Sequence, residues 1–333
     1  MPFNIIILHK LFRISVERLY SLMIKVYEYN TTYEKLWNDF VKNSKNGIFL
    51  FNRNFMEYHS DRFEDNSLLF FDNDELVALL PANIRDGILY SHQGLTYGGF
   101  ITNEKMKQHR MIECFDTLSE YAQEKNIKKL IYKSLPYIFF KQPADEDLYA
   151  LFLNNAKLLW IKPSTVLNLL NPLKMPKGRK AQISKAKREG VVIEESNDFD
   201  TFIDLENEVL KLHHNAKTVH TAEELKLLKS KFENNIRLYV AKYDNEIIAG
   251  ALLFIYEGVV HTQYLGANDK AREIGALDLL IKTLIDEYAI THKYFDFGTS
   301  VERDEKILNT GLISQKEGFG ARSVGYCCWE VSV

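Results

Sequence analysis

Basic side chains are concentrated between residues 174 and 188 of the chain. The stretch KMPKGRKAQISKAKREG holds seven lysine and arginine residues before its first acidic residue. Its proline and Gly178 indicate a turn into a helix, and Gly190 is typical of the C-terminal cap of that helix. The first helical turn would present free N–H groups beside Arg179 and Lys180, which favours binding of a phosphate or pyrophosphate. A solvated basic face and a nucleic-acid contact are the alternative interpretations.

Polar residues on two predicted strands form a second candidate site. In the strand over residues 293–298, alternation sends Asp296 to the face opposite Phe295 and Phe297. Asp296 lies near the carboxyl end of this strand, where parallel sheets usually bind ligands. We therefore expect Asp296 to act as a general base or to anchor an acceptor amine. The alternative is a carboxylate that accepts hydrogen bonds from loop N–H groups.

The preceding predicted strand carries His261 and Tyr264 on opposite faces. Tyr264 could protonate a leaving group or stack on a substrate, although strand tyrosines commonly belong to the core with the hydroxyl at its rim. His261 is expected to contact the substrate.

Three histidines, His213, His214 and His220, lie close together in the segment HHNAKTVH. No cysteine or acidic residue stands at metal-ligand spacing beside them, so we expect no metal site. They could instead line an acceptor pocket, His214 in particular, or simply pack between a helix and a loop. Earlier in the chain, SHQGLTYGGF combines glycines with aromatic and hydrogen-bonding residues, which lets a ligand approach the backbone closely. We expect His92 and Tyr97 of this segment to contact the substrate.

The elements that position these residues form a pattern that occurs twice. Residues 73–92 and 244–263 align without a gap, each with a turn, a glutamate, an apolar strand, an acidic residue followed by glycine, and a second apolar strand. The two glutamates, like the two glycines, are separated by 171 positions. Turn chemistry and strand pattern together predict two hairpins of the same design.

Each hairpin is followed by a long amphipathic segment, 104–125 or 270–292, and then by a short apolar strand, 129–136 or 293–300. A strand, helix and strand of this length usually form a parallel right-handed crossover. The sequence therefore predicts an α/β (α+β) fold of two tandem domains, each a mixed β-sheet flanked by helices, related by internal duplication. We expect the functional site where the two copies meet.

The length of 333 residues also favours two domains, because it exceeds one ordinary core. The proline-containing stretch over residues 160–177 is the predicted linker, which gives domains at residues 23–160 and 161–333. Residues 1–22 precede the first predicted strand and are interpreted as an N-terminal extension, with Met23 as an alternative start of translation. A short amphipathic helix that packs on the body or on a membrane surface is the other interpretation of this segment.

Composition argues against several classes of protein. The net charge of −3 gives no sign of a DNA-binding protein, and no apolar run approaches the roughly 18 residues of a membrane-spanning helix. Three cysteines provide neither a disulfide framework nor metal-ligand spacing. We therefore expect a cytoplasmic protein without a membrane span.

The order of the segments RKAQISKAKREGV, HTAEELKLL, YFDFGTS and GLISQKEGFGARS resembles that of the tandem GNAT acyltransferases of the Fem type and their relatives among bacterial surface-polysaccharide genes. Fem-type enzymes add amino acids to peptidoglycan precursors. The resemblance implies metal-independent transfer of an acyl or aminoacyl group from acyl-CoA or aminoacyl-tRNA to an amine or hydroxyl. It also implies that the acceptor lies between the two domains and the donor in the C-terminal one.

The resemblance implies roles for matching positions. A basic residue of the RKAQISK-like segment holds acceptor phosphates in Fem-type enzymes, which implies this role for Arg179, with Lys180 beside it. A family lysine in the segment that matches GLISQKEGFG lies near the acyl linkage of the donor, so Lys316 is expected to stabilise the developing oxyanion. The N-terminal copy has no counterpart of KEGFG and is expected to bind the acceptor without chemistry of its own.

The segment KAREIG departs from the pattern of ordinary GNAT enzymes, which hold the CoA pyrophosphate in a Q/R-x-x-G-x-G/A loop that opens a helix. Lys270 and Gly275 match the first basic residue and the last glycine, and they are the predicted cofactor-binding residues. Glu273 replaces the central glycine and would place a negative charge beside the phosphate. This departure favours either aminoacyl-tRNA as the donor, with tRNA as a partner, or an altered pose of CoA.

Together these features predict an acyltransferase that moves an acyl or aminoacyl group onto an amine or hydroxyl of a phosphate-bearing cell-envelope precursor. The acceptor would be a small or lipid-linked molecule, such as a sugar nucleotide, a muropeptide or a lipid-linked sugar. Strand N–H groups and Lys316 would hold the oxyanion, and Asp296 or a water would take the proton. The alternative is a non-catalytic module that keeps the fold and binds its ligand without turnover.

Overall fold

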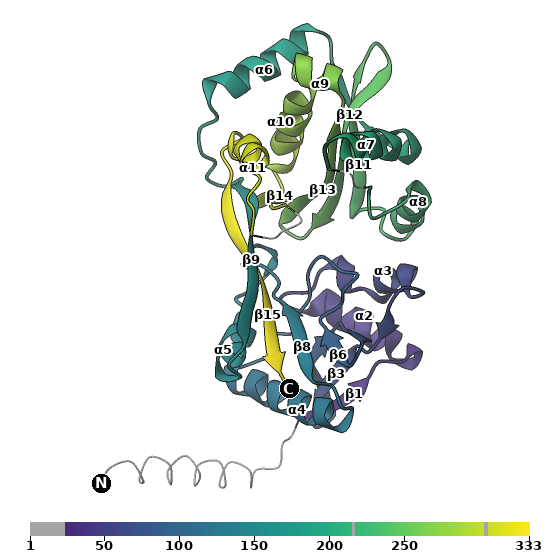
Figure 1. Ribbon diagram of the computed structural model, residues 1–333, viewed down its shortest axis with the longest axis vertical. Helices are drawn as coiled ribbons and strands as arrows, with labels where there is room; N and C mark the ends of the chain where they lie inside the picture. The colour runs from purple at the N-terminus through teal and green to yellow at the C-terminus, as the bar shows by residue number, and fades with distance from the viewer. Residues whose placement is uncertain (1–23, 215–216, 303–305) are drawn as a thin grey trace, which may run out of the picture.

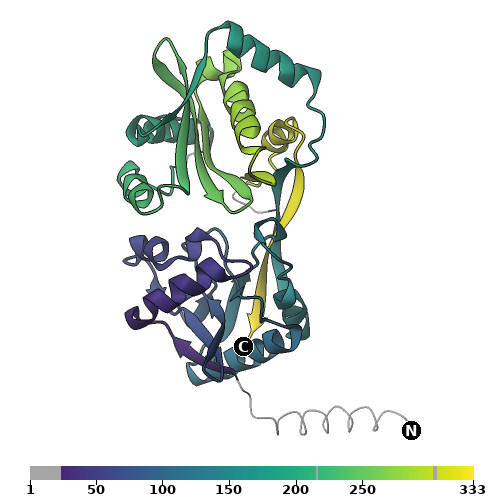
Figure 2. The ribbon, with the colours of Figure 1, turned by 180° about the vertical axis from the view of Figure 1, so that it is seen from behind.

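The computed structural model describes residues 24–214, 217–302 and 306–333. Figure 1 shows two bodies joined by two long strands, β9 (Lys157–Asn168) and β15 (Arg322–Ser332). The reverse view in Figure 2 shows the same two strands as the link between the bodies. The predictions made for residues 1–22 and for a start at Met23 lie outside the described residues.

The first body is built from the chain before β9. Its strands are β1 (Ile24–Glu28), β2 (Glu64–Asp65), β3 (Leu68–Asp72), β4 (Glu75–Leu80), β5 (Asn83–Arg85), β6 (Ile88–Tyr90), β7 (Ile101–Thr102) and β8 (Lys129–Lys133). Its α-helices are α2 (Glu34–Asn43), α3 (Arg53–Met56), α4 (Gln108–Glu124) and α5 (Glu146–Leu153), and its 3-10 helices are η1 (Thr31–Tyr33), η2 (Phe49–Phe51), η3 (Glu57–His59) and η4 (Tyr137–Phe139).

The second body is built from the chain between β9 and β15. Its strands are β10 (Val192–Ser196), β11 (Ile236–Tyr243), β12 (Glu246–Tyr256), β13 (Val259–Ala267) and β14 (Tyr294–Thr299). Its helices are α6 (Lys177–Arg188), α7 (Phe199–His214), α8 (Ala222–Lys231), α9 (Asp269–Ile274), α10 (Ala276–Tyr288) and α11 (Thr310–Glu317).

Among the described residues the strands form two sheets. The larger sheet has eleven strands in the order β10-β11-β12-β13-β14-β9-β15-β8-β6-β5-β2, and the smaller has four in the order β1-β3-β4-β7. The larger sheet contains a parallel pair in each body, β6 with β8 and β13 with β14. Helix α4 connects the first pair, and α9 with α10 connects the second. These two strand, helix, strand units confirm the predicted mixed-sheet fold.

The strand register confirms that the two hairpins have one design. In β3–β4 a bulge follows the pair Phe70 and Ala78, and in β11–β12 a bulge follows the pair Ala241 and Ala249. These bulges are separated by the same 171 positions as the aligned sequences. The turn glycines that follow β5 and β12 both adopt the left-handed conformation, with φ of 70° and 80°, which glycine adopts without steric cost.

The strands β9 and β15 are exchanged between the two bodies. β9 follows the first copy but pairs with β14 of the second, whereas β15 follows the second copy but pairs with β8 of the first. The two strands also pair with each other in antiparallel fashion. The predicted boundary between residues 160 and 161 lies inside β9, so each body takes a strand from the other copy.

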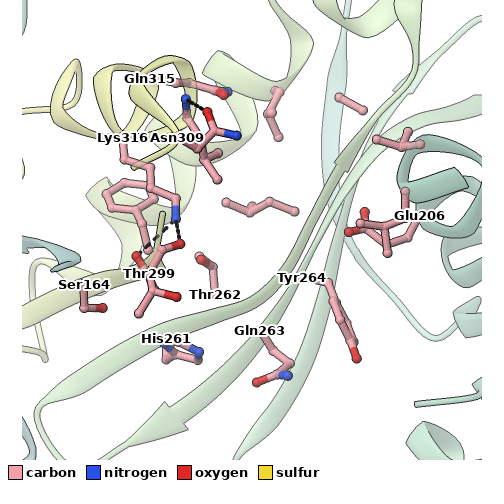
Figure 3. Close-up of a pocket in the computed structure, with 18 of the residues that line it drawn as sticks. Ser164, Glu206, His261, Thr262, Gln263, Tyr264, Thr299, Asn309, Gln315 and Lys316 are labelled. Atoms are coloured by element: carbon pink, nitrogen blue, oxygen red, sulfur yellow. Dashed lines mark hydrogen bonds between the residues drawn. The ribbon is translucent and has the colours of Figure 1, made fainter. Parts of the chain in front are cut away.

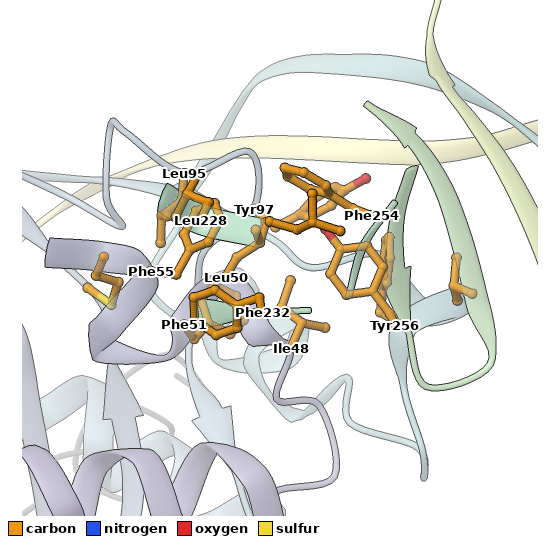
Figure 4. Close-up of a cluster of buried hydrophobic side chains, with 14 of the residues drawn as sticks. Ile48, Leu50, Phe51, Phe55, Leu95, Tyr97, Leu228, Phe232, Phe254 and Tyr256 are labelled. Carbon is orange, nitrogen blue, oxygen red and sulfur yellow. The ribbon is translucent and has the colours of Figure 1, made fainter. Parts of the chain in front are cut away.

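An apolar core also joins the two bodies, as Figure 4 shows. The ring of Phe49 from the first body lies 5.4 Å from that of Phe232 and 5.0 Å from that of Tyr256 in the second, measured between ring centroids. Burying such a side chain contributes roughly 1.5 to 3 kcal/mol. The bodies are therefore held as one unit. The cluster also includes Ile48, Leu50, Phe51 and Phe55 of the first body and Leu228 and Phe254 of the second.

Both predicted amphipathic segments form helices that bury apolar side chains. Met111, Phe115 and Leu118 of α4 are buried, as are Ile281 and Leu284 of α10. Within residues 24–214, 217–302 and 306–333, no helix combines the length and apolar character needed to cross a membrane. The same residues bring together no group of three metal-ligating side chains.

Candidate active site

A pocket of about 1200 Å³ lies where β13 and β14 diverge. The two strands pair in parallel over three positions, ending at His261 beside Asp296. A bulge at Gln263 then interrupts the pairing of β13 with β12 and bends the strand. The walls come from both bodies, because Tyr97 of the first body lines the pocket together with residues of α7, α10 and α11. Figure 3 shows the polar groups that converge on this space.

Asp296 is fully buried and accepts four hydrogen bonds. The donors are Nδ1 of His261 at 2.8 Å, Oγ of Ser164 at 2.7 Å, the N–H of Gly298 at 2.9 Å and the hydroxyl of Tyr97 at 3.4 Å. Burial alone would raise the pKa of this carboxyl, but His261 and the hydrogen bonds bring the pKa of Asp296 below its ordinary value. The carboxylate is therefore ionised and held in one orientation.

His261 links this carboxylate to the pocket. Its ring lines the cavity, whereas Asp296 lies behind it. Because Nδ1 faces Asp296, the neutral ring carries its lone pair on Nε2. A buried aspartate that orients a histidine in this way prepares the imidazole to accept a proton and stabilises the imidazolium that forms.

Lys316 supplies a fixed cation to the same pocket. It lies in α11, whose first turn is capped by the side chain of Asn309. Its Nζ donates hydrogen bonds to the main-chain carbonyls of Gly298 at 3.1 Å and Thr299 at 2.7 Å, as Figure 3 shows for the drawn residues. Burial lowers the pKa of Lys316 to about 8, and the charge of Asp296 acts in the opposite direction. An ammonium group fixed in this way is suited to stabilise a developing oxyanion.

Tyr264, on β13, lines the pocket as well. Its hydroxyl lies 2.9 Å from Nδ1 of His220 and accepts a hydrogen bond from the N–H of Val219 at 3.1 Å. Burial raises the pKa of Tyr264. These contacts fasten the loop before α8 to β13, and a role of Tyr264 as an acid toward the leaving group stays a prediction.

One predicted substrate-binding histidine, His92, lies apart from this geometry. His92 is buried outside the pocket lining and stacks on His59, with ring centroids 5.6 Å apart. Burial lowers the pKa of His92 to about 3, so the ring is neutral at physiological pH. The side chain of His214 lies outside the described residues. Substrate contacts of both histidines stay predictions.

Arg179 lines the pocket but is engaged with neighbouring groups. Its guanidinium forms an ion pair with Asp278 of α10, donates to the carbonyl of Gln315 at 3.0 Å and lies 4.6 Å from the ring centroid of Phe319. Lys180 is exposed on the surface of α6. Arg179 thus ties α6 to α10 and α11, and phosphate binding by Arg179 or Lys180 stays a prediction. The predicted helix is confirmed. Helix α6 ends at Arg188, Glu189 is its C-cap, and Gly190 follows with φ of 82°.

Of the predicted cofactor-binding residues, Lys270 lies in α9 and Gly275 is the C-cap of that helix, and both are outside the pocket lining. Nζ of Lys270 lies 3.4 Å from the carboxylate of Glu273 and 5.3 Å from the ring centroid of Tyr243. Gly275 has φ of 79°, and a Cβ at this position would lie only 2.6 Å from the main-chain oxygen of Gln182 in α6. The N-terminus of α10 is thus approached by the backbone of α6.

Gly275→Ala is expected to lower the free energy of unfolding by roughly 1 to 3 kcal/mol, because alanine would be strained at positive φ and its Cβ would collide with Gln182. The matched control is Gly178→Ala, since Gly178 lies in α6 with open space around it. Alanine there is expected to raise stability by about 0.5 to 1 kcal/mol. Urea unfolding measures both variants, and equal stabilities would contradict the structural role of Gly275.

Ser164 and Glu206 are among the pocket residues that the sequence analysis did not single out. Ser164 falls within the predicted linker and reaches Asp296 only because β9 pairs with β14. Glu206 carried a signal in the sequence, since it follows Phe202 by four positions and so stands on the apolar face of α7. An acidic residue at a buried helical position is a marker that sequence reasoning could have used.

Comparison with known proteins identifies the fold. Residues 177–306 match the family model described as Acetyltransferase (GNAT) domain. No curated protein matches the chain in sequence. Among solved structures, FemX is 11% identical with a TM-score of 0.66, and the similarity covers 93% of this chain and 97% of FemX.

Two further structures are similar over most of the chain. The C-terminal domain (DUF2156) of a putative lysylphosphatidylglycerol synthetase from Agrobacterium fabrum is 12% identical with a TM-score of 0.60, and 91% of this chain and 92% of that domain are covered. A tandem GNAT protein from the clavulanic acid biosynthesis pathway is 12% identical with a TM-score of 0.51, and 93% and 98% are covered. The duplicated hairpins, the paired crossovers and these likenesses lead to one conclusion: the chain has the tandem GNAT acyltransferase fold, similar to that of FemX.

Proposed function

We propose that the protein is an acyltransferase that moves an acyl or aminoacyl group onto an amine or hydroxyl of a phosphate-bearing cell-envelope precursor. The observation that carries this proposal is the meeting of His261, Asp296 and Lys316 at one pocket between the two bodies. A base and a cation on neighbouring walls match the two charges that develop when a nucleophile attacks a carbonyl.

The reaction follows from this geometry. The acceptor nitrogen or oxygen attacks the acyl carbon and gives its proton to Nε2 of His261, while Asp296 stabilises the imidazolium. Lys316 stabilises the negative charge on the carbonyl oxygen. The bond between the acyl carbon and the donor sulfur or oxygen then breaks, and the proton on His261 passes to that leaving group. Positioning of the two reactants in one cavity supplies a further part of the acceleration.

Two observations favour aminoacyl-tRNA over acyl-CoA in its usual pose. The backbone of α6 approaches Gly275 at the N-terminus of α10, where ordinary GNAT enzymes bind the CoA pyrophosphate, and Glu273 adds a carboxylate nearby. The exposed residues Lys177, Lys180 and Lys187 give α6 a basic outer surface, which suits a nucleic-acid backbone.

The first copy is proposed to serve the acceptor. By register, Tyr90 and Ile131 stand where His261 and Asp296 stand in the second copy. These residues cannot form the acid and base pair, so chemistry belongs to the second body. The first body contributes Tyr97 to the pocket wall, which supports an acceptor site between the bodies.

The crowded N-terminus of α10 also favours a second candidate function, a non-catalytic module that binds an acceptor without a donor.

A transfer assay separates the two candidate functions. Purified protein is incubated with alanyl-tRNA or acetyl-CoA and with a sugar nucleotide or a nucleotide-linked muropeptide, and products are detected by mass spectrometry. Transfer from either donor supports the enzyme, and transfer from alanyl-tRNA alone supports the preferred donor. Calorimetric binding of an acceptor without transfer from either donor would instead establish the binding module.

A further inference from the structure

Glu206 presents an unpartnered carboxylate to the pocket. The residue lies in α7 and is 5% exposed, and its Oε2 has no hydrogen-bond partner among the described residues. Burial raises the pKa of Glu206 to about 7. Figure 3 shows Glu206 across the pocket from Lys316 and Asn309.

The opposite strand leaves space for this carboxylate. A Cβ at Gly266 of β13 would collide with Oε2 of Glu206 and would lie 2.8 Å from Cδ2 of Leu205. On the same strand, Thr262 also lines the pocket, and its buried Oγ1 has no partner among the described residues. Two polar groups that line the pocket thus lack partners among the described residues, which indicates that a polar ligand completes the cavity.

The other acidic residues that line the pocket, Asp278 and Glu302, already have partners within the protein. Asp278 forms an ion pair with Arg179, and Glu302 accepts a hydrogen bond from Asn309 at 2.7 Å. A buried carboxylate without a partner loses its hydration and gains no hydrogen bond or ion pair that would compensate. An ammonium group on a ligand would supply both the missing charge and the missing donors, and hydrogen bonds between ionised groups are among the stronger ones.

We propose that Glu206 recognises a protonated primary amine of the substrate, distinct from the atom that attacks the acyl carbon. This inference rests on the proposed function and narrows its substrates. The ammonium group belongs either to an aminoacyl donor, as its α-amino group, or to an acceptor that carries a second amine. Binding at Glu206 would place the reacting carbonyl toward His261 and Lys316 on the other side of the cavity.

The test measures binding without turnover, so its outcome is independent of whether transfer occurs. L-alaninamide mimics the aminoacyl group, and glucosamine phosphate mimics an amine-bearing acceptor. The N-acetylated forms of both are the counterparts without an ammonium charge. Affinities are measured by NMR titration for the unmodified protein, for Glu206→Gln and for Glu302→Gln. The last variant removes a carboxylate from the same pocket that already has a partner.

At least one ammonium probe is expected to bind the unmodified protein, and Glu206→Gln is expected to weaken that binding by roughly 10- to 100-fold. Glu302→Gln should leave the affinity within about twofold. Preference for L-alaninamide places the ammonium group on the donor, and preference for glucosamine phosphate places it on the acceptor. The proposal is overturned if neither ammonium probe binds, if the acetylated forms bind equally well, or if both variants weaken binding alike.

Discussion

Asp296→Asn is expected to reduce the rate of acyl transfer by roughly 10³- to 10⁴-fold, with little change in substrate affinity. In this variant an amide N–H faces Nδ1 of His261, so the ring adopts the tautomer with its proton on Nε2. The nitrogen that faces the pocket can then no longer accept the proton of the attacking group. Steady-state kinetics together with calorimetric binding of the acceptor separates the loss of rate from any loss of affinity.

Ser164→Ala is the matched control for this prediction. It removes one hydrogen bond to Asp296 but leaves the bond from His261 intact, and the rate should fall by no more than about tenfold. Circular dichroism establishes that both variants are folded. If Asp296→Asn transfers acyl groups at the unmodified rate, Asp296 is a structural carboxylate that only satisfies N–H and O–H donors, which is the alternative drawn from the sequence.

Lys316→Met is expected to lower kcat by roughly 10²- to 10³-fold and to change KM much less, because the ammonium acts on charge that develops in the transition state. Methionine has a similar length and fills similar space. It removes the donor to the carbonyls of Gly298 and Thr299 as well, so thermal unfolding is measured alongside the kinetics. A rise in KM with unchanged kcat would show that Lys316 binds the ground state instead.

The pH dependence of the transfer rate tests whether Lys316 acts through its positive charge. The pKa of Lys316 is lowered to about 8, so the ammonium persists below pH 8 and is lost as the pH rises through that value. The rate of the unmodified enzyme should therefore decline above pH 8. Lys316→Arg keeps its charge at every pH in this range, and its lower rate should show no such decline. A decline of the same form in both proteins would assign the titration to another group.

Much of the fold could be predicted because its signals are local. Each copy carries its signals within about 20 residues: an acidic or asparagine turn before the glutamate, a turn glycine and alternating strands. The turn glycines have positive φ in the structure. Helix α6 and its glycine end follow from the same kind of signal. The exchange of β9 and β15 has no such signal, because pairing partners are chosen by contacts far apart in the sequence.

The candidate site could be predicted only in part. Lys316, Tyr264 and His261 line one pocket together with Tyr97 of the first body, and Asp296 contacts His261 behind it. Arg179 stood out in the sequence as a candidate phosphate ligand, yet it pairs with Asp278, a partner 99 positions away. Local sequence shows the charge of a residue but not the neutralising groups that tertiary packing places beside it.

The sequence by itself determined the duplication, the order of the elements and the types of residue available for the proposed acyl transfer, because periodicity and turn chemistry depend on near neighbours. Only the tertiary structure decided that His261, rather than Asp296, lines the pocket and that Oε2 of Glu206 has no hydrogen-bond partner among the described residues. Burial, hydrogen-bond direction and pKa depend on groups that long-range strand pairing brings together, and those distances exist only in the folded chain.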